Sequence, residues 1–408
     1  MKNKRRKQNV SLAIDIGSEA VKAVIFKGNS KGDKITVLSG AVAYFDKYGF
    51  FDGSDFEKDV FKKAIAKAIT EARNILFCSF VDKKLKKAVQ KQKRLEVLIS
   101  LSPDKLKTRI VDYSVLRKDP KKKISRTKEE NIRESVLNQA RKKICQKFAR
   151  GLGVLPIDIE WLSSKIIGIK IDGYCVPGLE GYEGKNLEFK ILSTFTTKYF
   201  LKSVKDTIKS LGFENCEVLP FAYNLANLLK DKKDGIFVDV GGEVTQIFLV
   251  KNGNIEGVDE FKSGGSAFTE AISQALGIDG DSARALKERY GSGLLGIEVA
   301  KKIESIVSRE QRKWYQGFKN KVRRLSPKEF SASNIYVFGG GSIMPEIKDI
   351  LEEKTDSVSR DLPLSVYSKV ERIFPKDIKG IEVINLNPNN SQIIPSLLSI
   401  CNYAKEIF

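Results

Sequence analysis

Apolar and polar residues alternate in several short segments of the chain, and two of these segments form a matched pair. Residues 13–28 read AIDIGSEAVKAVIFKG and residues 237–253 read FVDVGGEVTQIFLVKNG. Each contains an apolar strand, an aspartate, a glycine turn and a second alternating strand, which is the pattern of a β-hairpin. The repeat aligns three pairs of residues, namely Asp15 with Asp239, Gly17 with Gly241 and Glu19 with Glu243. A hairpin repeated half a chain apart predicts two lobes of like fold.

The turn of each predicted hairpin has the residues needed to hold a phosphate and a divalent cation. Turn glycines allow positive φ and leave backbone N–H groups pointing into an open concavity that can hold phosphate oxygens. An aspartate just before the turn suits Mg²⁺, which keeps most of its waters and takes one or two carboxylates. One such turn is an ordinary hairpin feature. Two matched copies indicate lobes that face each other across a nucleotide cleft, each supplying one phosphate turn.

A third motif combines a strand, three glycines and a helix in residues 333–351, SNIYVFGGGSIMPEIKDIL. The pattern predicts a helix entered near Met344 and Pro345, because proline favours the first turn of a helix. Three glycines in a row let a flat ligand lie against bare backbone. A Rossmann-type turn is the weaker interpretation, since the segment lacks the G-x-G-x-x-G spacing and no ribose-binding acid follows about 20 residues later.

Length and composition describe a folded protein of two or more domains that works without histidine chemistry. The chain has 408 residues, 41% of them hydrophobic, and five widely spaced cysteines, which indicate neither a zinc site nor a disulfide framework. There is no histidine, so imidazole bases and Ser-His or Cys-His nucleophiles are excluded. No apolar run reaches the roughly 18 to 20 residues of a membrane span, and the N-terminus does not resemble a secretory signal. We therefore expect a cytoplasmic protein.

The net charge of +21 is lysine-rich and spread along the chain, with denser stretches at residues 2–7, 83–94 and 117–128. A solvated surface is the simpler interpretation. No nucleic-acid partner is expected, because no RNP, zinc-finger or aromatic-interleaved basic motif accompanies the charge. The N-terminal MKNKRRK is either a peripheral contact for anionic membrane, at about 1 kcal/mol per basic residue, or a basic tail without a target.

The three motifs, in this order and at this separation, resemble those of the actin, Hsp70 and sugar-kinase superfamily. AIDIGSEAVKAVIF is similar to its first phosphate motif, FVDVGGEVTQIFLV to its second and IYVFGGGSIMPEI to its adenosine motif. Within the superfamily the chain most resembles FtsA, the bacterial cell-division actin homologue, from about residue 10 to the C-terminus. GIDGDSARALKERYGSG at residues 277–293 is similar to the FtsA helix that carries a lysine near the nucleotide, and Lys287 matches that lysine.

The resemblance implies an α/β protein with the actin-like ATPase fold, in which two duplicated ribonuclease-H-like lobes surround a nucleotide cleft. Residues 95–199 contain alternating strands and a long helix near 129–152, which resembles the inserted α+β domain of FtsA, called 1C or SHS2-like. The implied domains are a basic tail at 1–9, a first lobe at 10–94 and 200–234 with a terminal helix at 390–408, the insertion at 95–199, a second lobe at 235–263 and 331–389, and subdomain 2B at 264–330.

The resemblance also implies ATP and Mg²⁺ between the lobes. Asp15 and Asp239 would arrange the water shell of the metal, and Glu243 is a further catalytic candidate. The residues expected to contact the nucleotide are Gly17, Ser18, Gly241, Gly242, Lys287, Gly339, Gly340, Gly341 and Ser342. This set supports slow hydrolysis at most, because Glu217 and Glu243 are the only candidates for a water-activating base, and a metabolic enzyme is not expected.

The chain departs from the FtsA pattern at three places. Glu243 and Val244 stand where the second phosphate motif commonly has glycine and threonine, and Arg284 stands where a glutamate is usual. A carboxylate beside a phosphate repels it unless Mg²⁺ or lysine screens the pair, so Glu243 either coordinates metal, orients water or points away. The chain stops at Phe408 with the last actin-fold helix, so membrane attachment would need a device other than the amphipathic helix that usually ends FtsA.

The implied partners are peptides and further copies of the chain. An FtsA-like protein would bind the C-terminal peptide of FtsZ, the tubulin homologue, or another membrane-machinery peptide, and would self-associate into filaments. Residues 308–324 combine basic residues with Trp314, Tyr315 and Phe318, which indicates either a peptide dock or an amphipathic helix with its aromatics packed inward. The competing interpretations are a PilM-like cytoplasmic scaffold for type IV pilus assembly and a sugar or acetate kinase.

Overall fold

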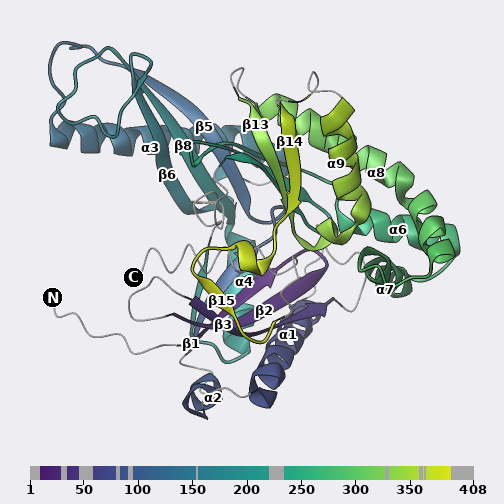
Figure 1. The fold of residues 1–408 in the computed structure, drawn as a ribbon. Helices are drawn as coiled ribbons and strands as arrows, with labels where there is room; N and C mark the ends of the chain where they lie inside the picture. Colours follow the sequence, from purple (N-terminus) through teal and green to yellow (C-terminus); the bar gives the residue numbers. More distant parts are fainter. Residues whose placement is uncertain are drawn as a thin grey trace. The chain divides into compact units, whose positions relative to one another are not determined.

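The computed structural model describes residues 10–28, 35–45, 58–79, 83–90, 95–152, 155–219, 234–326, 330–357, 362 and 364–386. The chain divides into two compact units, a first unit of Met1–Asp104 with Ser203–Phe408 and a second unit of Lys105–Lys202 (Figure 1). The predicted basic tail at 1–9 and the predicted terminal helix at 390–408 lie outside the described residues. Within the described ranges, no helix combines the length and apolar character that crossing a membrane requires.

The first unit contains two sheets of the same topology, which we call the first and second lobes. The first sheet has the order β15-β3-β2-β1-β4-β9 and the second β12-β11-β10-β13-β14. In both, three successive strands pair antiparallel, a later strand pairs in parallel with the first of them, and one more strand pairs in parallel with that later strand. The strands β10 to β14 therefore repeat β1, β2, β3, β4 and β9, which is the duplication that the repeated hairpin predicts.

The first lobe is built around β1, which is buried along its whole length and pairs with β2 on one edge and β4 on the other. A continuous apolar run is typical of such an interior strand. The strands of this lobe are β1 Val10–Ile16, β2 Ala20–Gly28, β3 Ile35–Tyr44, β4 Glu96–Leu101, β9 Asn215–Val218 and β15 Ile381–Val383. Its helices are α1 Lys58–Cys78, which packs on β2 and β3, and α2 Lys83–Gln90. Helix α4 Lys198–Ser210 leads from the second unit back into the first.

The second lobe combines its sheet with four longer helices. The strands are β10 Gly235–Val240, β11 Thr245–Lys251, β12 Asn254–Phe261, β13 Ala332–Phe338 and β14 Leu364–Arg372. The helices are α6 Gly265–Leu276, α7 Gly280–Gly291, α8 Ile297–Leu325 and α9 Pro345–Ser357, with short 3₁₀ turns η3 Gly340–Ile343 and η4 Pro375–Asp377. Helix α9 begins at Pro345, as the proline predicts.

The second unit is an antiparallel sheet of order β5-β8-β6-β7 with a long helix packed against it. Its elements are β5 Lys107–Leu116, α3 Arg126–Leu152, the 3₁₀ turn η2 Pro156–Asp158, β6 Ile159–Ile171, β7 Tyr174–Cys175 and β8 Asn186–Thr197. The predicted insertion begins at residue 95, but this unit begins at Lys105 because β4 pairs in parallel with β1 and so belongs to the first lobe. Likewise, residues 331–389 are predicted to belong to the second lobe, but β15 within this range pairs with β3 of the first lobe.

The aromatic segment of α8 faces the core and is not a peptide dock. Trp314 and Phe318 are fully buried and stack with ring centroids 5.7 Å apart, and Tyr315 is 6% exposed. The indole Nε1 of Trp314 donates a hydrogen bond to Thr245 Oγ1 on β11 at 2.9 Å. Of the two interpretations that the sequence allows, the inward-packed amphipathic helix is therefore correct, because its apolar stripe covers the sheet of the second lobe.

Replacing Trp314 with alanine should lower the free energy of unfolding by about 3–5 kcal/mol, because a large buried side chain is lost and a cavity remains. Urea denaturation would measure the change. The matched control is Arg312→Ala on the exposed face of the same helix, for which we expect less than about 0.5 kcal/mol. An unchanged unfolding free energy in Trp314→Ala would contradict the buried placement.

Candidate functional site

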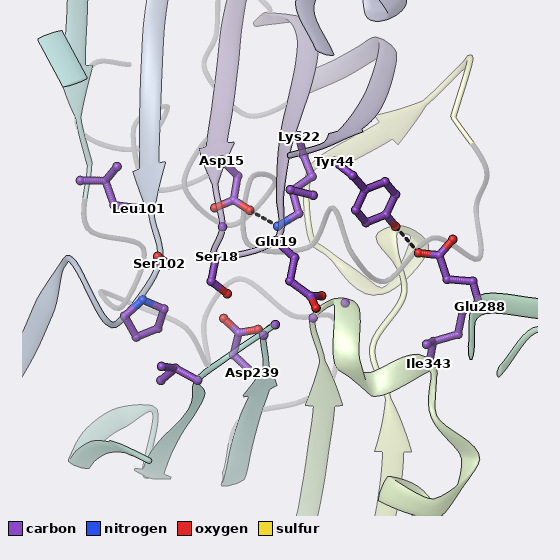
Figure 2. Close-up of a pocket in the computed structure, with 18 of the residues that line it drawn as sticks. Asp15, Ser18, Glu19, Lys22, Tyr44, Leu101, Ser102, Asp239, Glu288 and Ile343 are labelled. Carbon is purple, nitrogen blue, oxygen red and sulfur yellow. Dashed lines mark hydrogen bonds and ion pairs between the residues drawn. The ribbon is translucent and has the colours of Figure 1, made fainter. Parts of the chain in front are cut away.

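The two predicted acids lie at corresponding places in the two lobes and line one cavity between them, which we call the central cavity (Figure 2). Asp15 lies near the carboxyl end of β1 and Asp239 near the carboxyl end of β10. Both side chains are buried, with 4% and 6% of each residue exposed. The duplicated topology thus directs both hairpin ends, and both carboxylates, into the same space.

Lys22 supplies the positive charge beside this acid pair. It lies directly across the first hairpin from Asp15, and its Nζ is 2.8 Å from Asp15 Oδ2. The equivalent position in the second hairpin, opposite Asp239, is the neutral Gln246. Two buried carboxylates therefore have one ammonium group from the hairpins to balance them.

The imbalance affects Asp239 most. Burial, followed by the negative charge of Asp15, raises the pKa of Asp239 to about 7, against the opposing effect of the positive charge of Lys22. Gly339, at φ 90°, allows β13 to approach this carboxylate, because a Cβ there would stand 2.3 Å from Asp239 Oδ1. The acid is thus enclosed by backbone on one side and by the central cavity on the other.

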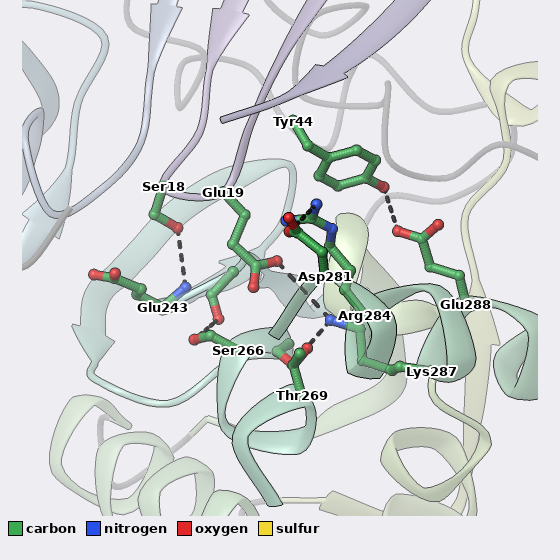
Figure 3. Close-up of polar contacts among 12 residues, drawn as sticks. Ser18, Glu19, Tyr44, Glu243, Ser266, Thr269, Asp281, Arg284, Lys287 and Glu288 are labelled. Atoms are coloured by element: carbon green, nitrogen blue, oxygen red, sulfur yellow. Dashed lines mark hydrogen bonds and ion pairs between the residues drawn. The ribbon is translucent and has the colours of Figure 1, made fainter. Parts of the chain in front are cut away.

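The two turns touch each other across the cavity (Figure 3). The backbone N–H of Glu243 donates a hydrogen bond to Ser18 Oγ at 3.0 Å. A Cβ on Gly242 would stand 2.7 Å from Ser18 Oγ and 2.6 Å from Glu19 Cγ, so only glycine fits at this contact. The N–H groups of Gly17 and Gly241 close their own hairpins onto Ala20 and Val244. These two glycines therefore shape the turns, and their N–H groups are already engaged.

Lys287 and the glycine motif complete the predicted set. Lys287 is buried, donates to the Gly265 carbonyl at 3.0 Å and lies 3.9 Å from Glu19 Oε2. Gly339 and Gly340 line the central cavity. Gly341 and Ser342 are buried next to them without lining it, and Ser342 Oγ donates to the Gly339 carbonyl at 2.7 Å. The structure brings the predicted residues together, except that the lining does not include Glu243, Gly341 or Ser342.

Among the lining residues that sequence reasoning missed, four have charged or aromatic side chains, namely Glu19, Lys22, Tyr44 and Glu288. Lys22 had a usable signal, because residues equidistant from a two-residue hairpin turn face each other, and this rule pairs it with Asp15. Tyr44 and Glu288 come from different lobes, and the Tyr44 hydroxyl hydrogen-bonds to a Glu288 carboxylate oxygen (Figure 3). Arg284, which replaces the usual glutamate, lies over the Tyr44 ring at 4.2 Å.

A second, larger cavity adjoins the central one, and Ile343 lines both. Its volume is about 550 Å³, against about 60 Å³ for the central cavity. Its other lining residues come from the ends of α7, α9 and β14 and from η4, and they include Gly291, Asp349, Arg372, Phe374 and Lys376. Burial lowers the pKa of Arg372 and raises that of Asp349. The wall of this larger cavity is therefore part apolar and part charged.

Across the described part of the chain, no three acidic or cysteine side chains cluster in a way that would hold a metal ion. A cation at the central cavity would therefore have at most the two hairpin carboxylates and complete its shell with water. Mg²⁺ accepts such a site, because it usually binds proteins through one or two carboxylates and retains several waters.

Comparisons with known proteins support this fold. The FtsA family model, described as Cell division protein FtsA, matches residues 236–381. Cell division protein FtsA of Neisseria meningitidis serogroup B is 25% identical over 200 residues, which cover 43% of this chain and 48% of that protein. The match thus spans about half the length of the curated relative.

Among solved structures, the PilM-PilN type IV pilus biogenesis complex aligns at a TM-score of 0.63 and 18% identity, covering 97% of this chain and 98% of that chain. The chain has the actin-like ATPase fold and resembles FtsA. MreB5 of Spiroplasma citri bound to AMPPNP aligns at a TM-score of 0.46 and 11% identity over 98% of both chains. The predicted resemblance and fold class of this FtsA-like chain are confirmed. That its second unit is a 1C-type domain stays a prediction.

Replacing Asp239 with asparagine should flatten the pH dependence of stability. The pKa of Asp239 is raised in the folded state. Between pH ~4 and ~7 the folded chain therefore holds a proton that the unfolded chain has lost. The free energy of unfolding consequently falls as the pH rises through this window, by up to ~4 kcal/mol. Urea denaturation between pH 4.5 and 7.5 would measure the slope. The exposed Glu270→Gln variant is the control, and an equal slope in Asp239→Asn and the parent chain would contradict the assignment.

Proposed function

We propose that this chain binds ATP with Mg²⁺ in the central cavity and that the bound nucleotide sets the arrangement of its two lobes for assembly with partners. The observation that supports this most directly is that two duplicated hairpins from opposite halves of the chain aim Asp15 and Asp239 into one cavity. Such convergence has no role in packing an apolar core. It suits a triphosphate with a hydrated cation, because a cation between the carboxylates and the phosphates balances the negative charge of both at one point.

The residues around the central cavity fit this ligand chemically. Asp15 and Asp239 would hold the ion through water, Ser18 and Gly242 would donate to phosphate oxygens, and Lys22 and Lys287 would balance charge. Glu19 Oε1 is buried without a hydrogen-bond partner and its residue lines the cavity, so a donor from a ligand or its water would satisfy it. Bound Mg²⁺ would neutralise developing phosphate charge during slow hydrolysis.

The larger cavity would receive the nucleoside. Its volume of about 550 Å³ falls within the roughly 300–1,000 Å³ of small-molecule sites, and it joins the central cavity at Ile343. Phe374 on one wall offers an apolar face, and Gly339 and Gly340 line the central cavity as bare backbone. Lys287 and Glu288, on one turn of α7, reach the central cavity beside this junction.

Phosphate entry requires the turns to separate, since about 60 Å³ holds a few waters at roughly 10–15 Å³ each but no triphosphate. Two cross-lobe hydrogen bonds hold the cleft closed, from Glu243 N–H to Ser18 Oγ and from the Tyr44 hydroxyl to Glu288. A ligand that binds only the open arrangement shifts the population toward it. Nucleotide binding and lobe geometry are thereby coupled.

For the cellular role we propose recruitment or anchoring of the FtsZ division ring, through the FtsZ C-terminal peptide and filaments of the chain itself. The FtsA family match over residues 236–381 supports this role. A PilM-like pilus scaffold is the second candidate, favoured by the second phosphate turn, where the Glu243 N–H is engaged by Ser18. Fluorescence polarisation of the full chain with an FtsZ C-terminal peptide, and with an N-terminal cytoplasmic peptide of a pilus membrane protein, would separate the two. Saturable binding of one peptide assigns the role.

Replacing Lys22 with methionine should weaken ATP binding by roughly tenfold or more, because an ammonium group next to the phosphates is lost and two carboxylates remain uncompensated. Isothermal titration calorimetry with Mg²⁺-ATP would measure the affinity. The control is Lys27→Met on the same strand, which does not line the cavity. If the folded parent chain shows no saturable ATP binding, the proposed function is wrong.

Replacing Tyr44 with phenylalanine should tighten ATP binding by roughly fivefold, because opening the cleft no longer costs a hydrogen bond of about 1 kcal/mol. Stopped-flow fluorescence with a labelled ATP analogue would show the gain mainly as faster association. The exposed Tyr182→Phe variant controls for loss of a hydroxyl elsewhere. Weaker binding in Tyr44→Phe would instead mean that the hydroxyl contacts the nucleotide.

A further inference from the structure

The second unit carries more than half of the net positive charge on about a quarter of the chain. Residues 105–202 contain 22 Lys and Arg against 11 Asp and Glu, a net charge of +11 out of +21. The nucleotide cavities lie in the first unit and do not use this charge. The excess therefore has no role in the nucleotide binding proposed above.

Part of this charge is concentrated on the C-terminal half of α3. Acidic residues occupy its first turns, whereas Lys142, Lys143 and Lys147 follow in its second half, all three exposed. Lys143 Nζ reaches the Asp112 carbonyl on β5 at 3.2 Å, and the Arg109 guanidinium lies 4.6 Å over the Phe148 ring. Cations of α3 and β5 thus lie next to each other.

Two large apolar side chains stand exposed where α3 leads into β6. Leu155 is 66% exposed and Ile157 72% exposed, on either side of Pro156, at the start of η2, which packs against α3. We call these two residues, together with Arg109, Lys142, Lys143 and Lys147, the α3 patch. The favourable position of cations near a helix C-terminus explains the lysines in part, but it does not explain leucine and isoleucine in water.

We propose that the α3 patch binds the surface of an anionic lipid membrane. Lysines beside a lipid surface gain electrostatic attraction to acidic headgroups, and exposed aliphatic side chains gain by entering the boundary between headgroups and acyl chains. The patch combines both features on one unit. This inference concerns the second unit only and does not depend on nucleotide binding.

The aromatic residues near the patch favour lipid over nucleic acid. Single-stranded nucleic acids bind by stacking bases on accessible aromatic faces. Here Arg109 lies over Phe148 and Arg141 over Trp161, while both rings also pack against Phe195 at centroid distances of 5.8 and 5.1 Å. The rings are occupied, and what the patch offers to solvent is ammonium groups and aliphatic side chains.

The test is flotation of the full chain with vesicles of phosphatidylcholine containing about 30% phosphatidylglycerol, and with pure phosphatidylcholine vesicles. The parent chain should float with the anionic vesicles only, and less at high salt. The triple variant K142Q/K143Q/K147Q should lower the partition coefficient about a hundredfold, taking each lysine as about a fivefold factor. The double variant Leu155→Ser with Ile157→Ser should lower it about tenfold.

Control variants elsewhere in the same unit remove the same number of lysines and one comparably exposed leucine. K121Q/K122Q/K123Q removes three exposed lysines of the same unit, and Leu116→Ser removes a 71% exposed leucine. Both should float as the parent does, and circular dichroism should show that every variant is folded. Equal losses in patch and control variants would overturn the proposal, since they would indicate unspecific charge.

Two further outcomes would also overturn it. One is flotation that depends on residues 1–9 but not on the patch. The other is that the chain does not float but binds an acidic peptide or an oligonucleotide saturably in polarisation assays, and that this binding depends on the patch. That result would assign the surface to a macromolecule. Neither result would bear on ATP binding, which calorimetry measures separately.

Discussion

The burial of two carboxylates at the junction of two sheets is the constraint on which the rest of the first unit depends. Removing an ionised carboxyl group from water is costly unless an opposite charge or a proton compensates it. Lys22 compensates Asp15 directly at 2.8 Å, while Asp239 responds with a raised pKa. The junction is thus polar where a core would be apolar, and the two lobes meet at a cleft instead of merging into one core.

The duplicated strand order explains why the acids meet at all. In each lobe the strand that carries the aspartate pairs antiparallel with its hairpin partner and parallel with a later strand. Carboxyl ends of parallel strands collect at one edge of a sheet, which is where ligands bind in open α/β folds. Turn glycines then allow contact, because Gly242 has no side chain to collide with Ser18 and Glu19. Strand direction brings the acids to the junction, and glycine sets how closely the turns approach.

Much of this arrangement was predictable from the sequence because it depends on local pattern repeated twice. The hairpins at residues 13–28 and 237–253, the strand before Gly339 and the helix beginning at Pro345 all have periodic or capping signals. The contact of Tyr44 with Glu288 had no such signal in the sequence, because the two residues come from different lobes and tertiary packing decides whether they meet. The inward face of Trp314 was an open alternative for the same reason, because an amphipathic helix shows an apolar stripe without showing what covers it. The start of the second unit was misplaced because the strand at Glu96–Leu101 has the same pattern whichever sheet it joins.

The replacement of the usual third glycine by Glu243 has a structural explanation in the contact between the turns. The position contributes its backbone N–H to Ser18, and any residue other than proline supplies that group. The glycine that cannot be replaced is Gly242, because a Cβ there would overlap the first turn. The second turn therefore keeps the one glycine that lobe contact requires and has lost one that a phosphate would favour. Contact between the two turns thus accounts for Gly242 and permits Glu243, because the first needs the absence of a side chain and the second contributes only its backbone N–H.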